Sequence, residues 1–589
     1  MILQALTQYY EDLEKQGKIA RPGWAKTKIS YALCINERGE LEQVIPLLEE
    51  TEGKKPQPRQ FDLPAPVSRH GKVILPNFLW DSSAYLLGID IKKPISQTQE
   101  YFKHSRMLHR KMLNDVDSKV ARAIIAFFDS WEPLAADSHP ILKDEYFNIT
   151  QGVNLLFRVD GVFAHDEILI QNVWQQHFAS LMEEGIQQQC LISGKLEPIA
   201  RTHPEIHGLP GASNPVLVGF NEDAFCSYGK VQNFNAPVGK HAAFAYTAAL
   251  NFLLIDRKNV YKIGDTTIVC WAEGAEPQYQ LLTCAALFDS RQLKIEEGDI
   301  RNAVKRLANA KPCIEWSIIP EKEFYILGIA ALCPGRVTVR FFYRNTFGKL
   351  MANINKHYNR LKIISPITQC ESRIIYPSTL LEKIQGSQNK AGKKMGSDVI
   401  NKLSRELVDS IIFNRPYPSQ IVAYTRSKVI RDAVVDYYRA AILKANLIKN
   451  NIIEEGTMEA YDENCNDIAY ILGAFFAICE EAQRLANPEV KATVHDRYFL
   501  LSINSPSVAF RQLSKLADVY IRQGKRTNSR KANYLNNEIK RLLIKIPAEE
   551  APIPHLFTPN QKDLFIIGYY HRKNWVGNKV NNIETKGDN

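Results

Sequence analysis

The sequence predicts an α+β protein: a mixed N-terminal α/β region with irregular long loops, followed by a C-terminal all-α helical bundle. Strand-like runs stop near residue 345, whereas beyond residues 386–397 almost every segment has the three- and four-residue apolar spacing of helices. A passage rich in Gly, Pro and Asn, Glu197–Gly239, interrupts the first half. At 589 residues the chain is long enough for roughly two to four domains.

Residues 1–95 predict a small α+β unit. An amphipathic helix opens the chain, and alternating apolar and polar residues at Lys28–Ile35 predict a strand. A polar, Pro-rich passage then leads to Pro76–Asp81, which reads PNFLWD.

Residues 96–385 predict a mixed α/β body with long Gly-rich loops. The expected helices are Tyr101–Trp131 in two pieces joined near Asn114, Ile168–Glu184, Lys240–Leu254 and a segment through Ile354. The expected strands are Val153–Asp160, Cys190–Ser193, Val216–Phe220, Thr266–Trp271, Phe324–Ile329 and Arg336–Tyr343. A loop as long as Glu197–Gly239 within a compact domain is usually functional or disordered.

Residues 386–397 (GSQNKAGKKMGS) predict a basic linker, residues 398–457 connecting helices, and residues 458–589 a helical bundle. Asn464 is the expected N-cap of the first long helix of that bundle. Three apolar stripes must each pack on another: Ile468, Leu472, Phe475, Cys479 and Ala482; Phe510, Leu513, Leu516 and Tyr520; Leu535, Ile539, Leu542 and Ile546.

Composition indicates a globular protein, since 45% of the residues are hydrophobic and 23% are charged. No apolar run approaches the roughly 18 residues of a membrane span, and the first residues lack the pattern of a signal peptide. The ten cysteines are scattered without a CxxC pair. We therefore expect a cytoplasmic protein with reduced thiols, no structural zinc and no membrane partner.

Catalytic motifs are missing. Gly386–Lys394 has the wrong spacing for a phosphate-binding loop and lacks its Ser or Thr. His203 and His207 are four residues apart, but the proline after His203 disfavours a helix that presents both to a metal. His165–Asp166 and His495–Asp496 lack further ligands in a recognisable order, so we expect capping or ion-pairing roles. No catalytic residue, metal or cofactor is predicted, and a metal-dependent nuclease is the enzymatic alternative.

Positive charge is concentrated near the C-terminus. The net charge is +10, and Arg497–Lys545 holds eleven Lys and Arg residues against two acids. Helical spacing puts several of these cations on a face away from the Phe510 stripe: Arg511, Lys515 and Arg522, continued by Arg526, Arg530 and Lys531. Acids that would pair with them are nearly absent. The pattern predicts a groove that follows a phosphate backbone without reading bases, with an ordinary solvated face as the alternative.

Several strings resemble one family, the large subunit of type I-C CRISPR interference complexes. The matching strings follow the family order over nearly the whole chain: PNFLWD (76–81), CLISGKLEPIARTHPEIHG (190–208), FNEDAFCSYGKVQNFNAP with AFAYTAALNFLL (220–254), IGDTTIVCWAE (263–273), RPYP (415–418), AYILGAFFAICEEAQ (469–483), DRYF (496–499) and GYYH (568–571).

The resemblance implies a non-enzymatic subunit of an RNA-guided DNA-surveillance complex. A guide RNA reads sequence by base pairing, while the protein reads a short motif that flanks the target in double-stranded DNA and promotes strand separation and R-loop formation. Its implied partners are the guide RNA complex, backbone subunits, an RNA-processing subunit and a recruited helicase-nuclease. The alternative binding function is a stand-alone nucleic-acid scaffold.

Within this resemblance, Asn77 is the expected reader of the flanking motif, because an amide offers a donor and an acceptor to a base edge. Arg69 and Lys72 are expected to hold the DNA backbone. Phe78 or Trp80 is expected to wedge against the first base step, or to belong to the core.

A Gly-rich loop, Gly208–Asn214, is the second candidate DNA contact, through Gly208, Gly211, Ser213 and Asn214. Here the chain departs from the family pattern. His207 stands where the family has lysine, the loop is shorter than usual, and LGIAALCPGR lacks the frequent L-S-P-N. The contact made by that lysine is therefore not carried over to this chain.

The resemblance also implies an internally translated small subunit. Met458 precedes the predicted bundle, and the codons for Glu454, Glu455 and Gly456 form a purine-rich string that resembles a ribosome-binding site. We expect a separate product, Met458–Asn589, that carries the basic helices.

Overall fold

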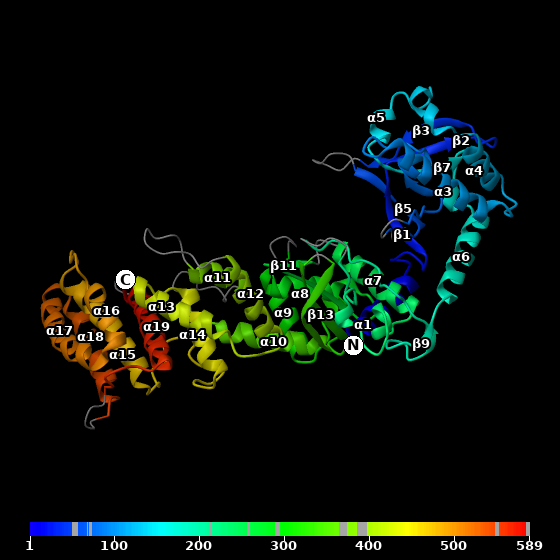
Figure 1. Ribbon diagram of the computed structural model, residues 1–589. Coiled ribbons are helices and arrows are strands. Elements are labelled where there is room, and N and C mark those ends of the chain that lie inside the picture. Colours follow the sequence, from blue (N-terminus) through cyan, green and yellow to red (C-terminus); the bar gives the residue numbers. More distant parts are fainter. Residues whose placement is uncertain are drawn as a thin grey trace. The chain divides into compact units, whose positions relative to one another are not determined.

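The computed structural model describes residues 1–49, 57–67, 69, 73–210, 215–255, 260–288, 295–333, 335–363, 374–385, 397–547 and 553–584. These residues form two compact units, which are coloured along the chain in Figure 1. The N-terminal unit comprises Met1–Ile255 and Cys333–Val337, and the C-terminal unit comprises Asp256–Leu332 and Thr338–Asn589.

A five-stranded sheet forms the centre of the N-terminal unit. Its strands run in the order β3 (Leu41–Pro46), β2 (Tyr31–Ile35), β7 (Asn154–Val159) and β6 (Trp80–Ser82), and β8 (Val162–Phe163) pairs with β7. The β2–β7 pair is parallel and the others are antiparallel. A smaller sheet has the order β1 (Trp24–Ile29), β5 (Gln57–Pro64) and β4 (Leu48–Glu49), and β9 (Gln187–Gln189) and β10 (Leu196–Pro198) form a hairpin.

Helices cover the central sheet because their apolar stripes meet its buried face. The rings of Phe127 and Phe128 on one helix pack edge-on against Phe157 of β7, with centroids 5.3 and 5.6 Å apart. Ser118 caps that helix by accepting a hydrogen bond from the Ala121 N–H. The α-helices of this unit are α1 (Ile2–Lys15), α2 (Ser83–Leu86), α3 (Ile95–Leu113), α4 (Lys119–Ser130), α5 (Tyr146–Ile149), α6 (Ile168–Glu183) and α7 (Lys240–Ile255). Its 3₁₀ helices are η1 (Pro133–Ser138), η2 (Ala164–Asp166), η3 (Asp223–Phe225) and η4 (Gln232–Asn235).

The C-terminal unit begins with a four-stranded sheet and continues as helices. The sheet order is β11 (Tyr261–Ile263), β12 (Thr266–Ala272), β13 (Glu323–Cys333) and β14 (Arg336–Thr346). The helices are α8 (Pro277–Leu287), α9 (Glu297–Ala308), η5 (Ile314–Trp316), α10 (Phe347–Leu361), α11 (Pro377–Gln385), α12 (Ser397–Ile412), α13 (Ser419–Asp432), α14 (Tyr437–Lys449), α15 (Ile468–Ala486), α16 (Val494–Asn504), α17 (Pro506–Thr527), α18 (Ser529–Ile544) and α19 (Pro559–Glu584). One continuous apolar core runs from this sheet into the last helices.

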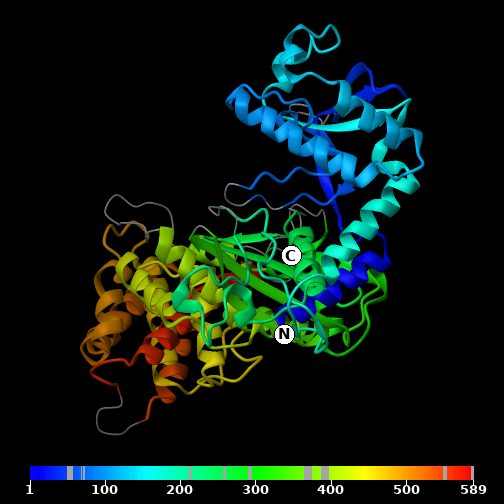
Figure 2. The same cartoon turned by 45° about the vertical axis from the view of Figure 1, so that its right-hand side comes forward.

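Helices α15 and α19 pack closely because each presents a glycine to the other. A Cβ on Gly473 would overlap the carbonyl oxygen of Phe565, and a Cβ on Gly568 would overlap that of Tyr470. Only a hydrogen fits at either position, so the two backbones approach each other directly. Figures 1 and 2 show the orange and red helices of this region side by side.

The structure confirms the predicted α+β class and the helical C-terminal region. The strands predicted at Cys190–Ser193 and Val216–Phe220 are wrong. Cys190–Ser193 is a turn in which the Cys190 Sγ accepts the Ile192 and Ser193 N–H groups, and at Val216 the chain makes a single bridge to Arg336. Asn464 is not the N-cap of α15, because Asp467 accepts the Ala469 and Tyr470 N–H groups instead.

The predicted domain boundaries stay predictions. The parallel pair of β2 and β7 joins residues from both sides of the predicted boundary at 95, and the two compact units divide after Ile255. The predicted basic linker, residues 386–397, lies outside the described residues except for Ser397, where α12 begins. Among the described residues, no helix combines the length and the apolar character that crossing a membrane requires.

Candidate nucleic-acid interface

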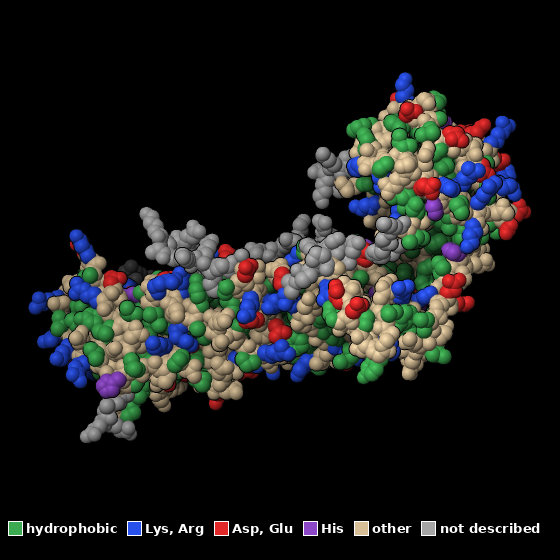
Figure 3. Space-filling model, in the orientation of Figure 1, with side chains coloured by type: hydrophobic (Ala, Val, Ile, Leu, Met, Phe, Trp, Pro, Cys, Tyr) green, Lys and Arg blue, Asp and Glu red, His purple; other side chains and the backbone are tan. Residues whose placement is uncertain are grey.

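The basic residues of α17 lie on the face opposite its core contacts. Phe510 and Leu513 are buried, whereas Arg511, Lys515 and Arg522 are exposed. Their four- and seven-residue separations keep these three cations on one side of a helix with 3.6 residues per turn. Figure 3 shows Lys and Arg side chains gathered over α17 and α18.

A short connection extends this charge into α18. Asn528 is the only residue between the two helices, and its side chain accepts the Lys531 N–H at 2.9 Å. Arg526 lies in the last turn of α17 and Arg530 in the first turn of α18, and both side chains are exposed. We define the basic face as the five exposed cations Arg511, Lys515, Arg522, Arg526 and Arg530. In the described part of the chain no carboxylate forms an ion pair with them, unlike the pair of Arg541 with Glu538.

Lys531 differs from the other predicted members of this face. Its ammonium lies 3.2 Å from a carboxylate oxygen of Glu481, and its side chain is half-buried. A cation with a fixed carboxylate partner has less charge to offer a phosphate. We therefore leave Lys531 out of the basic face.

The PNFLWD segment is buried and is held in place by several hydrogen bonds. The Asn77 side-chain oxygen accepts the Val67 N–H at 2.9 Å, and the Asn77 N–H donates to the Asp81 carboxylate at 2.8 Å. Asn77 is buried, so in this conformation its amide oxygen holds the neighbouring loop instead of meeting a solvent-exposed base. Trp80 is buried as well, with its indole N–H donating to the Pro64 carbonyl oxygen at 2.8 Å.

Phe78 lies in the core, which is the alternative stated for it, and its role as a wedge stays a prediction. Its ring stacks between His109 and Trp174, with centroids 5.5 and 5.6 Å away, and the residue is 1% exposed. His109 accepts the Leu79 N–H through Nε2 and binds the Ser105 carbonyl oxygen through Nδ1. Burial lowers the pKa of His109 to about 4, so the ring is neutral at pH 7. The three consecutive bulky residues of PNFLWD are compatible with a wedge or with a core position, and in this structure Phe78 packs in the core.

Arg69 lies at the protein surface beside the PNFLWD segment. Its guanidinium pairs with Asp81, donates to the Leu75 carbonyl oxygen at 2.7 Å and stacks on the Tyr85 ring at 4.1 Å. A third of its side chain stays exposed, at 33%. The other predicted backbone contact, Lys72, lies outside the described residues.

The Gly-rich loop starts from a fixed base. The Ile206 N–H donates to the Pro215 carbonyl oxygen at 2.7 Å, and the His207 N–H donates to the Asn251 side chain at 2.7 Å. Gly208 has φ +88°, a conformation that a side chain disfavours. Gly211, Ser213 and Asn214 lie outside the described residues, so their predicted DNA contacts stay predictions.

Of the two histidines considered as metal ligands, His203 has another partner for its side chain. His203 is buried and its Nδ1 lies 2.6 Å from the Tyr246 hydroxyl, while burial lowers its pKa to about 4. Asp496 caps α16 through Thr493, which confirms its expected capping role. His165 lies 3.4 Å from Asp166, but burial lowers the pKa of His165, so its expected ion-pairing role stays a prediction. The described residues hold no cluster of three or more potential metal ligands.

The sequence reasoning missed an exposed aromatic turn. Tyr228 is 100% exposed, and the guanidinium of Arg336, distant in sequence, lies 4.4 Å from the centroid of the nearby Phe225 ring. The string SYGK could have indicated it, because a tyrosine before a glycine in a loop is an unusual turn residue.

The fold and this surface define an α+β protein whose helical C-terminal half carries an unpaired basic face. A family model described as "CRISPR-associated protein (Cas_Csd1)" matches residues 6–576, and the chain belongs to this family. The membership supports a place for the chain among the subunits of a CRISPR Cascade complex. No curated protein matches the sequence significantly.

Proposed function

We propose that this chain is the large, non-enzymatic subunit of a type I-C RNA-guided DNA-surveillance complex, in which it recognises the motif that flanks the target and promotes strand separation. Membership of the CRISPR-associated family across residues 6–576 is the observation that carries the proposal. Guide RNA, backbone subunits, an RNA-processing subunit and a recruited helicase-nuclease are the proposed partners.

The basic face is the proposed contact with the DNA backbone. Its five cations repeat along α17 and the start of α18 with no carboxylate partner among the described residues, and such an arrangement binds phosphates without reading bases. The buried segment that contains Asn77 is the proposed site of recognition of the flanking motif, with Arg69 at its exposed edge.

The basic face can be tested by the salt dependence of duplex binding. Neutralising Arg511, Lys515 and Arg522 to Gln should weaken binding equally for all sequences and reduce the slope of log K against log salt by about 2 to 3. The matched control neutralises three arginines that are already ion-paired, Arg431, Arg484 and Arg541, and should leave that slope nearly unchanged. An equal fall in both variants would mean that net charge, not this face, drives binding.

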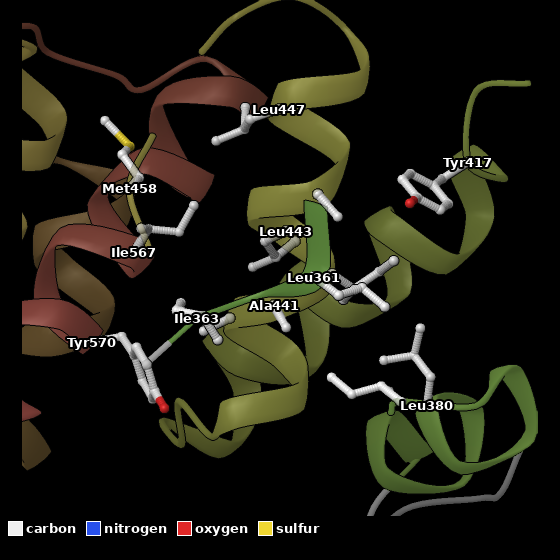
Figure 4. Close-up of a cluster of buried hydrophobic side chains, with 14 of the residues drawn as sticks. Leu361, Ile363, Leu380, Tyr417, Ala441, Leu443, Leu447, Met458, Ile567 and Tyr570 are labelled. Carbon is white, nitrogen blue, oxygen red and sulfur yellow. The ribbon is translucent and has the colours of Figure 1, made fainter. Parts of the chain in front are cut away.

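The separate product from Met458 is part of the same proposal. Met458 is buried beside α14 and α19, near Ile567 and Tyr570 (Figure 4), so Met458→Leu keeps a similar apolar side chain in the full-length protein. The variant should remove a small companion band from the purified complex while the full-length band remains. If the small band persisted, another start site or proteolysis would produce it.

A further inference from the structure

The turn Ser227–Lys230 presents an aromatic ring to solvent in a conformation that tyrosine rarely adopts. Tyr228 and Gly229 have φ values of +55° and +70°, and the Lys230 N–H donates to the Ser227 carbonyl oxygen at 3.0 Å. Two consecutive positive φ angles favour Asn or Gly at the first position, and a tyrosine there is strained. Such strain persists at functional positions when the surroundings enforce it.

Asn235 is the residue that enforces this conformation. Its side-chain oxygen accepts the Ser227 N–H at 2.9 Å, and its amide nitrogen donates to the carbonyl oxygens of Lys230 and Gln232 at 3.1 and 2.8 Å. These three bonds hold both sides of Tyr228. The ring is therefore presented on a rigid support, and a ligand that binds it orders little additional chain.

Cations surround the base of this turn. Arg336 stacks on Phe225 at 4.4 Å and donates to the Asn221 side chain at 3.1 Å, while Arg201 donates to the Gln232 side chain at 2.6 Å. Arg201, Lys230 and Arg336 are all exposed, against two exposed acids in the same loop, Glu222 and Asp223.

These features fit a nucleic-acid base better than a protein groove. A protein partner would need a continuous apolar patch. Ser227 and Gly229 flank Tyr228, Lys230 stands between it and the exposed Val231 in the sequence, and a guanidinium covers part of Phe225. A fully exposed ring, Tyr228, beside the partly covered ring of Phe225 and among cations, is an arrangement that stacks an unpaired base and holds its phosphates.

We propose that Tyr228 is a stacking platform for an unpaired base of single-stranded nucleic acid. The inference rests on the proposed role in DNA strand separation, which generates such bases. Because every base has a π-face, the platform is indifferent to sequence. It discriminates against duplexes, whose bases are already stacked.

The test uses the full-length chain and an oligothymidylate that carries one 2-aminopurine, whose fluorescence is quenched when it stacks on an aromatic ring. Tyr228→Ala should weaken binding of the single strand about tenfold and abolish the quenching, whereas Tyr228→Phe should stay within about twofold of the original protein. Asn235→Ala, which frees the turn, should give a smaller loss than Tyr228→Ala. Phe147→Ala is the matched control, because Phe147 is another exposed aromatic residue of the same unit.

Two results would overturn this inference. One is unchanged affinity and quenching in Tyr228→Ala, and the other is a loss of copurifying protein subunits in that variant while single-strand affinity is kept, which would indicate a protein contact. Both leave the proposed function intact if the basic-face variant still changes the salt slope on duplex DNA. Conversely, a chain that copurifies with no guide RNA but needs Tyr228 for single strands would contradict the proposed function alone.

Discussion

The carboxylate of Asp563 on α19 is fully buried and accepts two hydrogen bonds from one edge of the Arg426 guanidinium on α13, from Nε and Nη2, each with an N–O distance of 2.7 Å. Residues on either side of Met458 thus meet in a two-bonded ion pair. The same helix contacts α14 through its apolar side chains, as Figure 4 shows for Ile567 and Tyr570. A product that begins at Met458 lacks Arg426 and must leave Asp563 in water or pair it elsewhere.

Replacing Arg426 should therefore destabilise the full-length chain. The short product lacks this residue, so its stability cannot depend on the ion pair with Asp563. Arg426→Met leaves a buried carboxylate without its partner, and we expect a loss of about 3 to 5 kcal/mol in the free energy of unfolding, measured in urea. Arg431→Met, on the same helix but exposed, is the control and should change stability by less than about 1 kcal/mol. Equal losses in the two variants would show that the buried ion pair contributes no more to the free energy of unfolding than an exposed one.

The close approach of α15 and α19 predicts opposite outcomes for two glycine substitutions. Gly568→Ala directs a methyl group at the Tyr470 backbone, which cannot move without shifting a helix, and should cost about 3 kcal/mol. Gly298→Ala, in α9 with open space around its Cβ, should stabilise the chain by about 0.5 to 1 kcal/mol. Thermal unfolding measures both, and a tolerated Gly568→Ala would contradict the packing.

Helical periodicity explains what the sequence could predict. The stripes that contain Phe475, Phe510 and Leu535 are mostly buried, because a long apolar stripe has few alternative partners. Four of their residues are only half-buried: Ile468, Leu516, Tyr520 and Ile546. Short apolar runs are ambiguous: Val216–Phe220 has the composition of a strand, but no neighbouring strand pairs with it beyond one bridge. Secondary structure that depends on a distant partner is not encoded in local pattern.

In the candidate site, too, local patterns predicted some features, whereas features that depend on distant residues were missed. Exposure of Arg511 and Lys515 followed from spacing within one helix. The burial of Phe78 depends on Trp174, nearly a hundred residues away, and could not follow from PNFLWD alone. Tyr228 was missed because its exposure depends on the bonds of Asn235, which a linear pattern does not reveal.

Acid should destabilise both units through buried neutral histidines. Burial lowers the pKa of His109 to about 4 and that of His357 to about 3, whereas an unfolded histidine titrates near about 6.5. Between those values the unfolded chain binds a proton that the folded chain does not, so stability falls as pH falls. Each histidine contributes roughly 1.4 kcal/mol per pH unit in that window. Urea unfolding at pH 7.5 and pH 5 measures the loss, and His109→Gln should make it smaller.

The last prediction concerns how Asn77 acts on motif recognition. Because its side-chain oxygen holds the Val67 N–H, Asn77→Ala should free the loop that carries Arg69, lower stability by about 1 to 2 kcal/mol and speed hydrogen exchange at Val67. Asn36→Ala is the matched control, since Asn36 likewise accepts backbone N–H groups in a turn of the same unit.

If Asn77 is a positioning residue, discrimination among flanking motifs should fall together with protection at Val67, and the control should lose stability without losing discrimination. A variant that keeps Val67 protected but loses discrimination would mean that the amide reads a base directly, after a rearrangement that exposes it. Unchanged discrimination in Asn77→Ala would remove this residue from motif recognition altogether and leave Arg69 and the Gly-rich loop as the candidates.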